Sequence, residues 1–172
     1  MIEDIGLLLL RVALGALLCY HGGIKLGLFG GRGARGFSVG LEKLGIRPSL
    51  PFAVLAACSQ TAGGVLLALG FLGPVGALLL ASNMAVAVLV LLKNGFGMAR
   101  GGYEYSLVLA VAFLALSLTG PGRYSVDGLL HLSLPEPLTW IVIAAGGTLG
   151  VLATVVARKR RPAPAADAGP AA

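Results

Sequence analysis

The stretch LLLLRVALGALLCYHGGIKLG, residues 7–27, decides the fold class of this chain. The apolar run at residues 5–21 is long enough to cross a lipid bilayer as one helix. Arg11 stands in the middle of this run, and His21 and Lys25 follow at its end. An arginine at the centre of a membrane helix costs about 2.5–3.5 kcal/mol. We therefore expect Arg11 to point into a helix bundle and to have a partner there.

The rest of the chain is equally apolar. Of its 172 residues, 57% are hydrophobic and only 12% are charged, whereas soluble domains carry about 25% charged residues. Four more segments have the length and hydropathy of membrane spans, at residues 52–72, 74–92, 103–119 and 138–157. The sequence thus predicts an all-α integral membrane protein, a four-helix transmembrane bundle plus a fifth C-terminal transmembrane helix.

The distribution of Lys and Arg predicts the orientation. In a five-span protein one side holds eleven of them and the other side holds only Arg123; with four spans the division becomes seven against five. The eleven are Lys25, Arg32, Arg35, Lys43, Arg47, Lys93, Arg100, Arg158, Lys159, Arg160 and Arg161. Because cytoplasmic loops are enriched in Lys and Arg, we expect a membrane protein with its N-terminus outside and its C-terminus in the cytoplasm. The net charge of +6 then reflects the membrane and not a nucleic-acid partner.

Three regions follow from this pattern. Residues 1–127 form the bundle, residues 128–157 form an outside loop and the extra transmembrane helix, and residues 158–172 form a basic, disordered cytoplasmic tail. Between the first two spans, Phe37, Leu41 and Leu44 are spaced as one face of a short helix. This helix lies in the cytoplasmic interface, or it covers a site that opens toward the cytoplasm.

Polar residues within the apolar layer are candidates for a ligand-binding site. At 1.5 Å per residue, Arg11, Gln60 and Asn83 lie about 12–16 Å from the cytoplasmic end of their spans. Arg11 is on the same helix face as Gly15, and Gln60 on the same face as Gly64, which places both faces against other helices. We interpret the three side chains as the deep layer of a polar column. The alternative is that they form interhelical hydrogen bonds that only stabilise the bundle.

His21, Lys25 and Glu104 lie near the cytoplasmic ends of their spans. In the same column they form a mouth, where Glu104 meets His21 and Lys25. The alternative is that the two basic side chains extend to the interface and Glu104 joins them in a solvated ion pair.

The residues resemble the DoxX family of small bacterial membrane proteins. The resemblance rests on Arg11 with the His21-Gly-x-x-Lys25 pattern, on the GGYE of residues 101–104, and on the GPGRYSVD of residues 120–127. It implies a four-helix membrane bundle and a link to respiratory or redox chemistry, since a relative, DoxD, is a subunit of a thiosulfate:quinone oxidoreductase. The chain departs from the family at Gln60, where a Glu is usual, and in its fifth span.

Three functions fit these observations. The first is a membrane subunit linked to respiratory, redox or oxidative-stress chemistry that binds a quinone in the polar column, which would be at most part of a quinone-linked oxidoreductase. The second is a non-catalytic adaptor for a redox or stress-response complex, and the third is a small-molecule carrier. No motif for haem, flavin, an iron–sulfur cluster or a metal ion occurs, so we expect no intrinsic cofactor and assign no catalytic residue. Besides the lipid bilayer, the partners are a redox protein or further copies of this chain.

Overall fold

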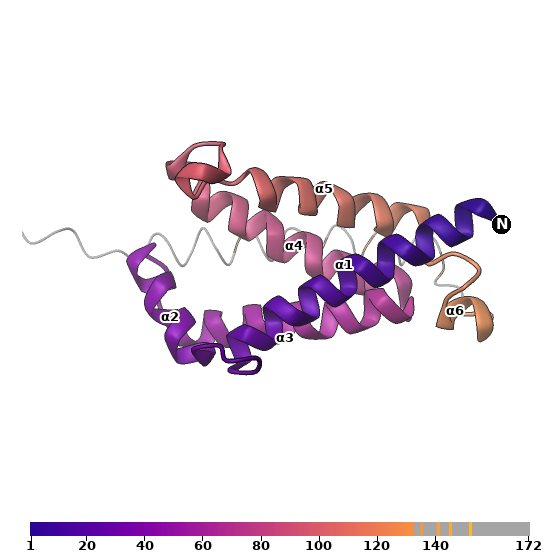
Figure 1. The fold of residues 1–172 in the computed structure, drawn as a ribbon, viewed down its shortest axis with the longest axis horizontal. Coiled ribbons are helices and arrows are strands. Elements are labelled where there is room, and N and C mark those ends of the chain that lie inside the picture. The colour runs from indigo at the N-terminus through magenta and orange to yellow at the C-terminus, as the bar shows by residue number, and fades with distance from the viewer. Residues whose placement is uncertain (133–134, 136–140, 142–144, 146–151, 153–172) are drawn as a thin grey trace, which may run out of the picture.

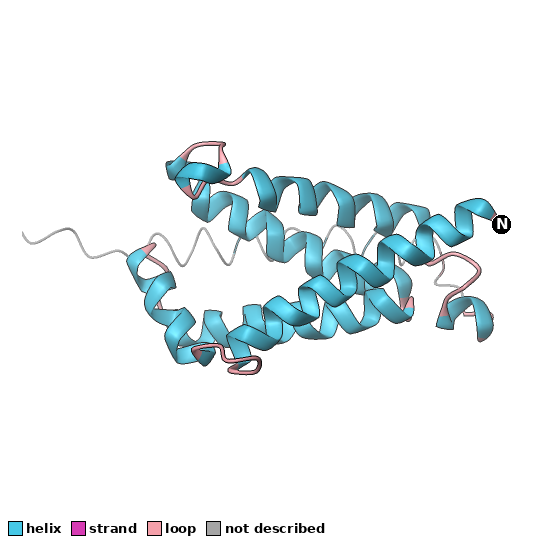
Figure 2. Ribbon diagram, in the orientation of Figure 1, coloured by secondary structure: helices cyan, strands magenta, loops and turns pink. Residues whose placement is uncertain are grey.

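The computed structural model describes residues 1–132 and the single positions 135, 141, 145 and 152. The described part of the chain is helical and contains no strand (Figure 2). The predicted fifth helix at residues 138–157, apart from those single positions, and the tail at residues 158–172 lie outside the described residues.

Four long helices form a bundle (Figure 1). They are α1 (Ile2–Leu26), α3 (Ser49–Leu69), α4 (Gly73–Leu91) and α5 (Glu104–Thr119). All four spans predicted between residues 5 and 119 are therefore helices, with ends within a few residues of the expected ones. Among the described residues, two helical segments, Ser49–Leu69 and Gly73–Asn94, are long and apolar enough to cross a membrane, and Glu104–Thr119 is apolar but shorter.

Short helices occupy the two ends of the bundle. At one end lie α2 (Gly33–Lys43), η1 (Leu92–Asn94) and η2 (Met98–Arg100); at the other lie the N-terminus and α6 (Val126–Leu129) (Figure 1). We call these the α2 end and the α6 end. The short helix predicted from the spacing of Phe37, Leu41 and Leu44 is confirmed as α2, which ends at Lys43, one residue before Leu44.

Small residues let α1 and α3 pack backbone to backbone. A Cβ atom added at Gly15 would lie 2.6 Å from the carbonyl oxygen of Gly64, and one added at Gly64 would lie 2.7 Å from that of Gly15. A side chain at Gly22 would overlap Thr61 in the same way. The predicted small-residue faces therefore meet each other, and this contact fixes the register of the two antiparallel helices.

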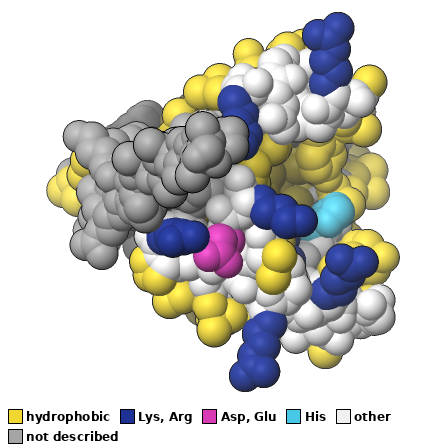
Figure 3. Space-filling view, turned by 90° about the vertical axis from the view of Figure 1, so that its left-hand side faces the viewer, with side chains coloured by type: hydrophobic (Ala, Val, Ile, Leu, Met, Phe, Trp, Pro, Cys, Tyr) yellow, Lys and Arg dark blue, Asp and Glu magenta, His cyan; other side chains and the backbone are white. Residues whose placement is uncertain are grey.

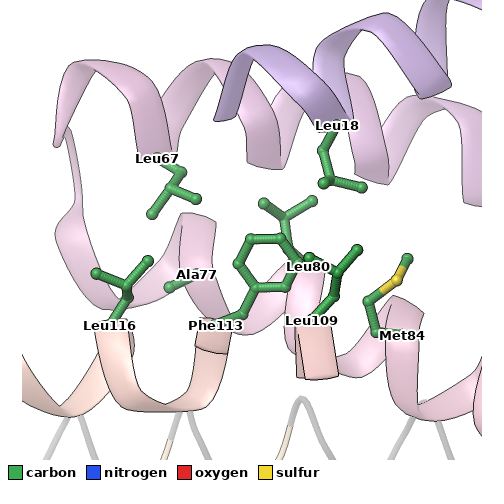
Figure 4. Packing of buried hydrophobic residues seen from close by; sticks show 8 residues of the cluster. All are labelled: Leu18, Leu67, Ala77, Leu80, Met84, Leu109, Phe113 and Leu116. Carbon is green, nitrogen blue, oxygen red and sulfur yellow. The ribbon is translucent and has the colours of Figure 1, made fainter. Parts of the chain in front are cut away.

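The core of the bundle lies between α1, α3, α4 and α5. Phe113 of α5 is fully buried and packs among side chains from the other helices (Figure 4). Its cluster contains Leu18, Leu67, Ala77, Leu80, Met84, Leu109 and Leu116. Many large apolar side chains elsewhere remain exposed, including Leu55, Val108 and Val111, as expected for helices that face lipid.

Candidate functional site

A pocket of about 440 Å³ lies at the α2 end of the bundle. Side chains of α1, α3, α4 and α5 form its walls, and Phe37, Leu41 and Leu44 of the α2 segment cover it. The hydrophobic face of α2 thus lines a cavity. On this side of the molecule, Figure 3 shows a hollow lined by hydrophobic side chains, with Lys and Arg side chains around it.

A chain of hydrogen bonds crosses one wall of the pocket. Nζ of Lys25 donates to Oε1 of Gln60 over 2.6 Å, and Nε2 of Gln60 donates to Oδ1 of Asn83 over 3.0 Å. Nδ2 of Asn83 then donates to Oγ of Ser59 over 2.8 Å, and Ser59 donates to the carbonyl oxygen of Ala56. All donors in this chain point the same way, from the ammonium of Lys25 toward a backbone carbonyl at its far end.

Three of the predicted site residues are therefore brought together, but not in the predicted layers. Gln60 and Asn83 were expected to share a deep layer with Arg11. Instead, Gln60 is bonded to Lys25, and Asn83 is bonded to Gln60. Lys25 reaches them because its side chain turns inward from the end of α1, where its Nζ also lies 4.6 Å from the centre of the Phe37 ring. His21 lines the same pocket.

Two residues of α5 line the pocket from another wall. Ser106 is 7% exposed and lines the cavity together with Tyr105. Within the described part of the chain, the Ser106 hydroxyl has no hydrogen-bond partner. Sequence reasoning missed Ser106, because a serine next to the aromatic start of an apolar helix carries no distinguishing signal.

Glu104 does not belong to the pocket. Its Oε2 accepts a 3.0 Å hydrogen bond from the backbone N–H of Met98, and within the described residues it forms no ion pair with Lys25. The prediction that Glu104 meets His21 and Lys25 is wrong. The reason is the fold of the loop before α5. The N–H groups of Tyr103 and Glu104 donate to the carbonyl oxygens of Gly95 and Phe96, so the loop folds back and brings the N–H of Met98 to the Glu104 carboxylate.

Arg11 lies at the opposite end of the bundle. It is 2% exposed, which confirms that it points inward, but Nη2 donates a 2.7 Å hydrogen bond to the backbone carbonyl of Tyr124. Nε and Nη1 are buried without a hydrogen-bond partner among the described residues. The grouping of Arg11 with Gln60 and Asn83 is thus wrong. Its depth was counted at Cα, whereas a long helical side chain leans toward the N-terminus of its helix and here extends toward the α6 end.

Asp127 supplies the negative charge that Arg11 needs. Its carboxylate is buried and lies close enough to stabilise the guanidinium electrostatically. The two carboxylate oxygens accept hydrogen bonds from the N–H groups of Leu72 and Gly73, at the start of α4. Asp127 therefore caps α4 and balances Arg11 at once. The sequence motif at residues 120–127 contains this residue, but nothing in the spacing linked it to Arg11.

Gly70 makes room for this arrangement. It ends α3 with φ of 63°, and a Cβ atom there would overlap Nη1 of Arg11. The glycine thus serves both the left-handed turn and the close approach of the guanidinium.

Comparison with known proteins fits this architecture. The DoxX family model matches residues 6–93, which include α1 to α4 and the Lys25–Gln60–Asn83 chain. The chain belongs to the DoxX family. It is 29% identical over 132 residues to the inner membrane protein YqjF of Escherichia coli (strain K12), which covers 76% of this chain and 95% of YqjF. No solved structure matches the chain. This DoxX protein is accordingly a membrane protein.

Proposed function

We propose that this DoxX protein binds a quinone in the pocket at the α2 end, as a membrane component of redox or oxidative-stress chemistry. The observation that carries the proposal is the pocket itself: an apolar cavity of about 440 Å³ with one hydrogen-bonded polar wall. Ligand pockets in proteins have volumes of about 300–1,000 Å³ and combine apolar walls with a few placed polar groups.

The polar groups suit a ring that carries carbonyl oxygens. Lys25 uses one of its three N–H donors on Gln60, which leaves donors for a ligand oxygen. The hydroxyl of Ser106 approaches from α5, a helix that does not contribute to the Lys25–Gln60–Asn83 chain. The apolar side chains of α2, α3 and α4 would pack against the faces of the ring.

We further propose that the α2 end faces the cytoplasm. Among the described residues, the segments at this end contain seven basic residues, and Arg123 belongs to the α6 end. The seven are Lys25, Arg32, Arg35, Lys43, Arg47, Lys93 and Arg100. An excess of Lys and Arg on one side is typical of the cytoplasmic side of membrane proteins. The pocket would then lie in the cytoplasmic leaflet, where a lipid-soluble quinone is available.

Binding can be measured directly on the detergent-purified protein. We expect a decyl-substituted ubiquinone to bind saturably at one site. Asn83→Ala should weaken binding about two- to tenfold, because it removes the acceptor that holds the Gln60 amide, and with it Lys25, in place. Asn94→Ala is the matched control, because Asn94 donates only to the carbonyl of Gly101 in the loop outside the pocket. Absence of saturable binding would refute the proposal and would favour the adaptor function.

A further inference from the structure

Within the described part of the chain, the pocket contains a cation with no anion to match it. The described lining includes Lys25 but no Asp or Glu. Two acidic side chains of the segments at the α2 end have other partners. Glu42 forms an ion pair with Arg47 over 3.1 Å, and Glu104 accepts a hydrogen bond from the backbone N–H of Met98. Among the described residues, Lys25 has as partners only the neutral amide of Gln60 and the ring of Phe37.

Lys25 is half-buried, and an ammonium that lines an apolar pocket without a counter-charge is costly. Intramembrane charges are usually paired with one another or with a ligand. Arg11, the buried cation at the α6 end, does have a negative charge within electrostatic reach, that of the Asp127 carboxylate. The difference between these two sites indicates that the negative charge for Lys25 comes from outside the chain.

The unpartnered hydroxyl of Ser106 is a second, independent sign of a missing ligand. Ser106 is more than nine-tenths buried and lines the same cavity. Ser117 on the same helix is equally buried, yet its hydroxyl donates to the carbonyl of Leu114 over 2.7 Å. A buried hydroxyl normally has a partner, either in the protein or in a bound molecule.

We infer that the ligand of this pocket is an apolar molecule with an acidic oxygen that is deprotonated at neutral pH, held by an ion pair with Lys25. This inference rests on the proposed pocket and narrows its ligand class. Within the quinones it selects hydroxyquinones over neutral ones, and outside the quinones it includes fatty-acid carboxylates. An ionised oxygen forms a stronger hydrogen bond with an ammonium than a neutral carbonyl does.

Two naphthoquinones of nearly the same shape test the inference. In 2-hydroxy-3-methyl-1,4-naphthoquinone the hydroxyl is ionised at neutral pH, whereas 2,3-dimethyl-1,4-naphthoquinone is neutral; substitution at both ring positions prevents addition of cysteine thiols. We expect the purified protein to bind the anion at least about tenfold more tightly, as one charge-assisted hydrogen bond allows. Dodecanoate should compete with it, and dodecanol should not.

Three variants test whether Lys25 causes the preference for the anionic naphthoquinone over the neutral one. Lys25→Met should abolish this preference, and Lys25→Arg should retain it. Lys43→Gln removes an exposed cation of α2 that does not line the pocket, and it should leave the preference unchanged. Circular dichroism checks that each variant is folded. If Lys25→Met does not fold, Lys25→Arg and the comparison of dodecanoate with dodecanol decide whether the pocket prefers an anionic ligand.

The outcomes separate the two proposals. Equal binding of both naphthoquinones refutes the anionic ligand and leaves quinone binding intact. Binding of dodecanoate without either naphthoquinone supports the anionic ligand and refutes the quinone. Binding of none of the three probes refutes both.

Discussion

Nζ of Lys25 lies 2.6 Å from Oε1 of Gln60, at the position where the resemblance to the DoxX family implies a glutamate. Substitution Gln60→Glu would place a carboxylate beside the ammonium and complete an ion pair inside the pocket. We expect this variant to bind the anionic naphthoquinone about tenfold more weakly, because the protein then supplies the counter-charge itself.

Gln60→Met is the matched control for this experiment. It removes the amide without adding charge, so the preference for the anion over the neutral naphthoquinone should persist. Titration of both variants by isothermal calorimetry distinguishes them. If Gln60→Glu binds the anion as tightly as the unmodified protein, Lys25 is not the group that attracts it.

Ser106→Ala should weaken ligand binding by about two- to tenfold, the contribution of one hydrogen bond. The same change should leave thermal stability in detergent unaltered, because the hydroxyl has no partner within the described part of the protein. Ser117→Ala should behave in the opposite way, since Ser117 donates to the carbonyl of Leu114 and does not line the pocket. A loss of stability in Ser106→Ala with unchanged affinity would contradict the assignment of Ser106 to the ligand.

Gly70→Ala should destabilise the bundle by about 2–4 kcal/mol, because the added methyl group overlaps Arg11 and alanine disfavours a positive φ. Gly6→Ala is the control, since no atom lies within 4 Å of the added group. Thermal unfolding of both variants followed by circular dichroism measures the difference. Similar melting temperatures for the two variants would show that Arg11 is not packed on Gly70.

Asp127→Asn should lower the free energy of unfolding by about 1–3 kcal/mol, because one N–H at the start of α4 loses its acceptor and Arg11 loses its balancing charge. Part of that loss should disappear in an Arg11→Met background, where no guanidinium needs the charge. Asp4→Asn serves as the comparison, since Asp4 is at the same end of the bundle but at the surface, with contacts to the N-terminus and to the Arg123 N–H. Additive effects of the Arg11 and Asp127 substitutions would show that the two residues are not coupled.

The sequence predicted the helices well and the polar partners poorly, for a physical reason. Hydropathy is an average over about twenty residues, so a single exception such as Arg11 does not obscure a long apolar helix. The small-residue face was also predictable, because Gly15 and Gly64 leave room that only a neighbouring backbone can fill. These features depend on helix geometry alone.

The partners of long side chains depend on much more. The Arg11 side chain extends to Tyr124 at the α6 end, and the Lys25 side chain turns inward from the end of α1 to Gln60, so that Cα depth did not reveal where either charge ends. Asp127 became a partner of Arg11 only through the fold of the chain after α5, and no periodic pattern marks that return. Glu104 accepts a hydrogen bond from the backbone N–H of Met98 in the adjacent loop, which lies nearer in sequence than Lys25 does.

The contact between Arg11 and Tyr124 also has a consequence for the order of synthesis. The ribosome makes Arg11 among the first residues of the chain and its carbonyl partner 113 residues later. During that interval α1 carries a guanidinium whose backbone partner has not yet been made. The segment after α5, which is made late, therefore supplies the partners of Arg11 in the first helix. A chain that stops at Thr119 would retain the charge of Arg11 without the Tyr124 carbonyl and the Asp127 carboxylate.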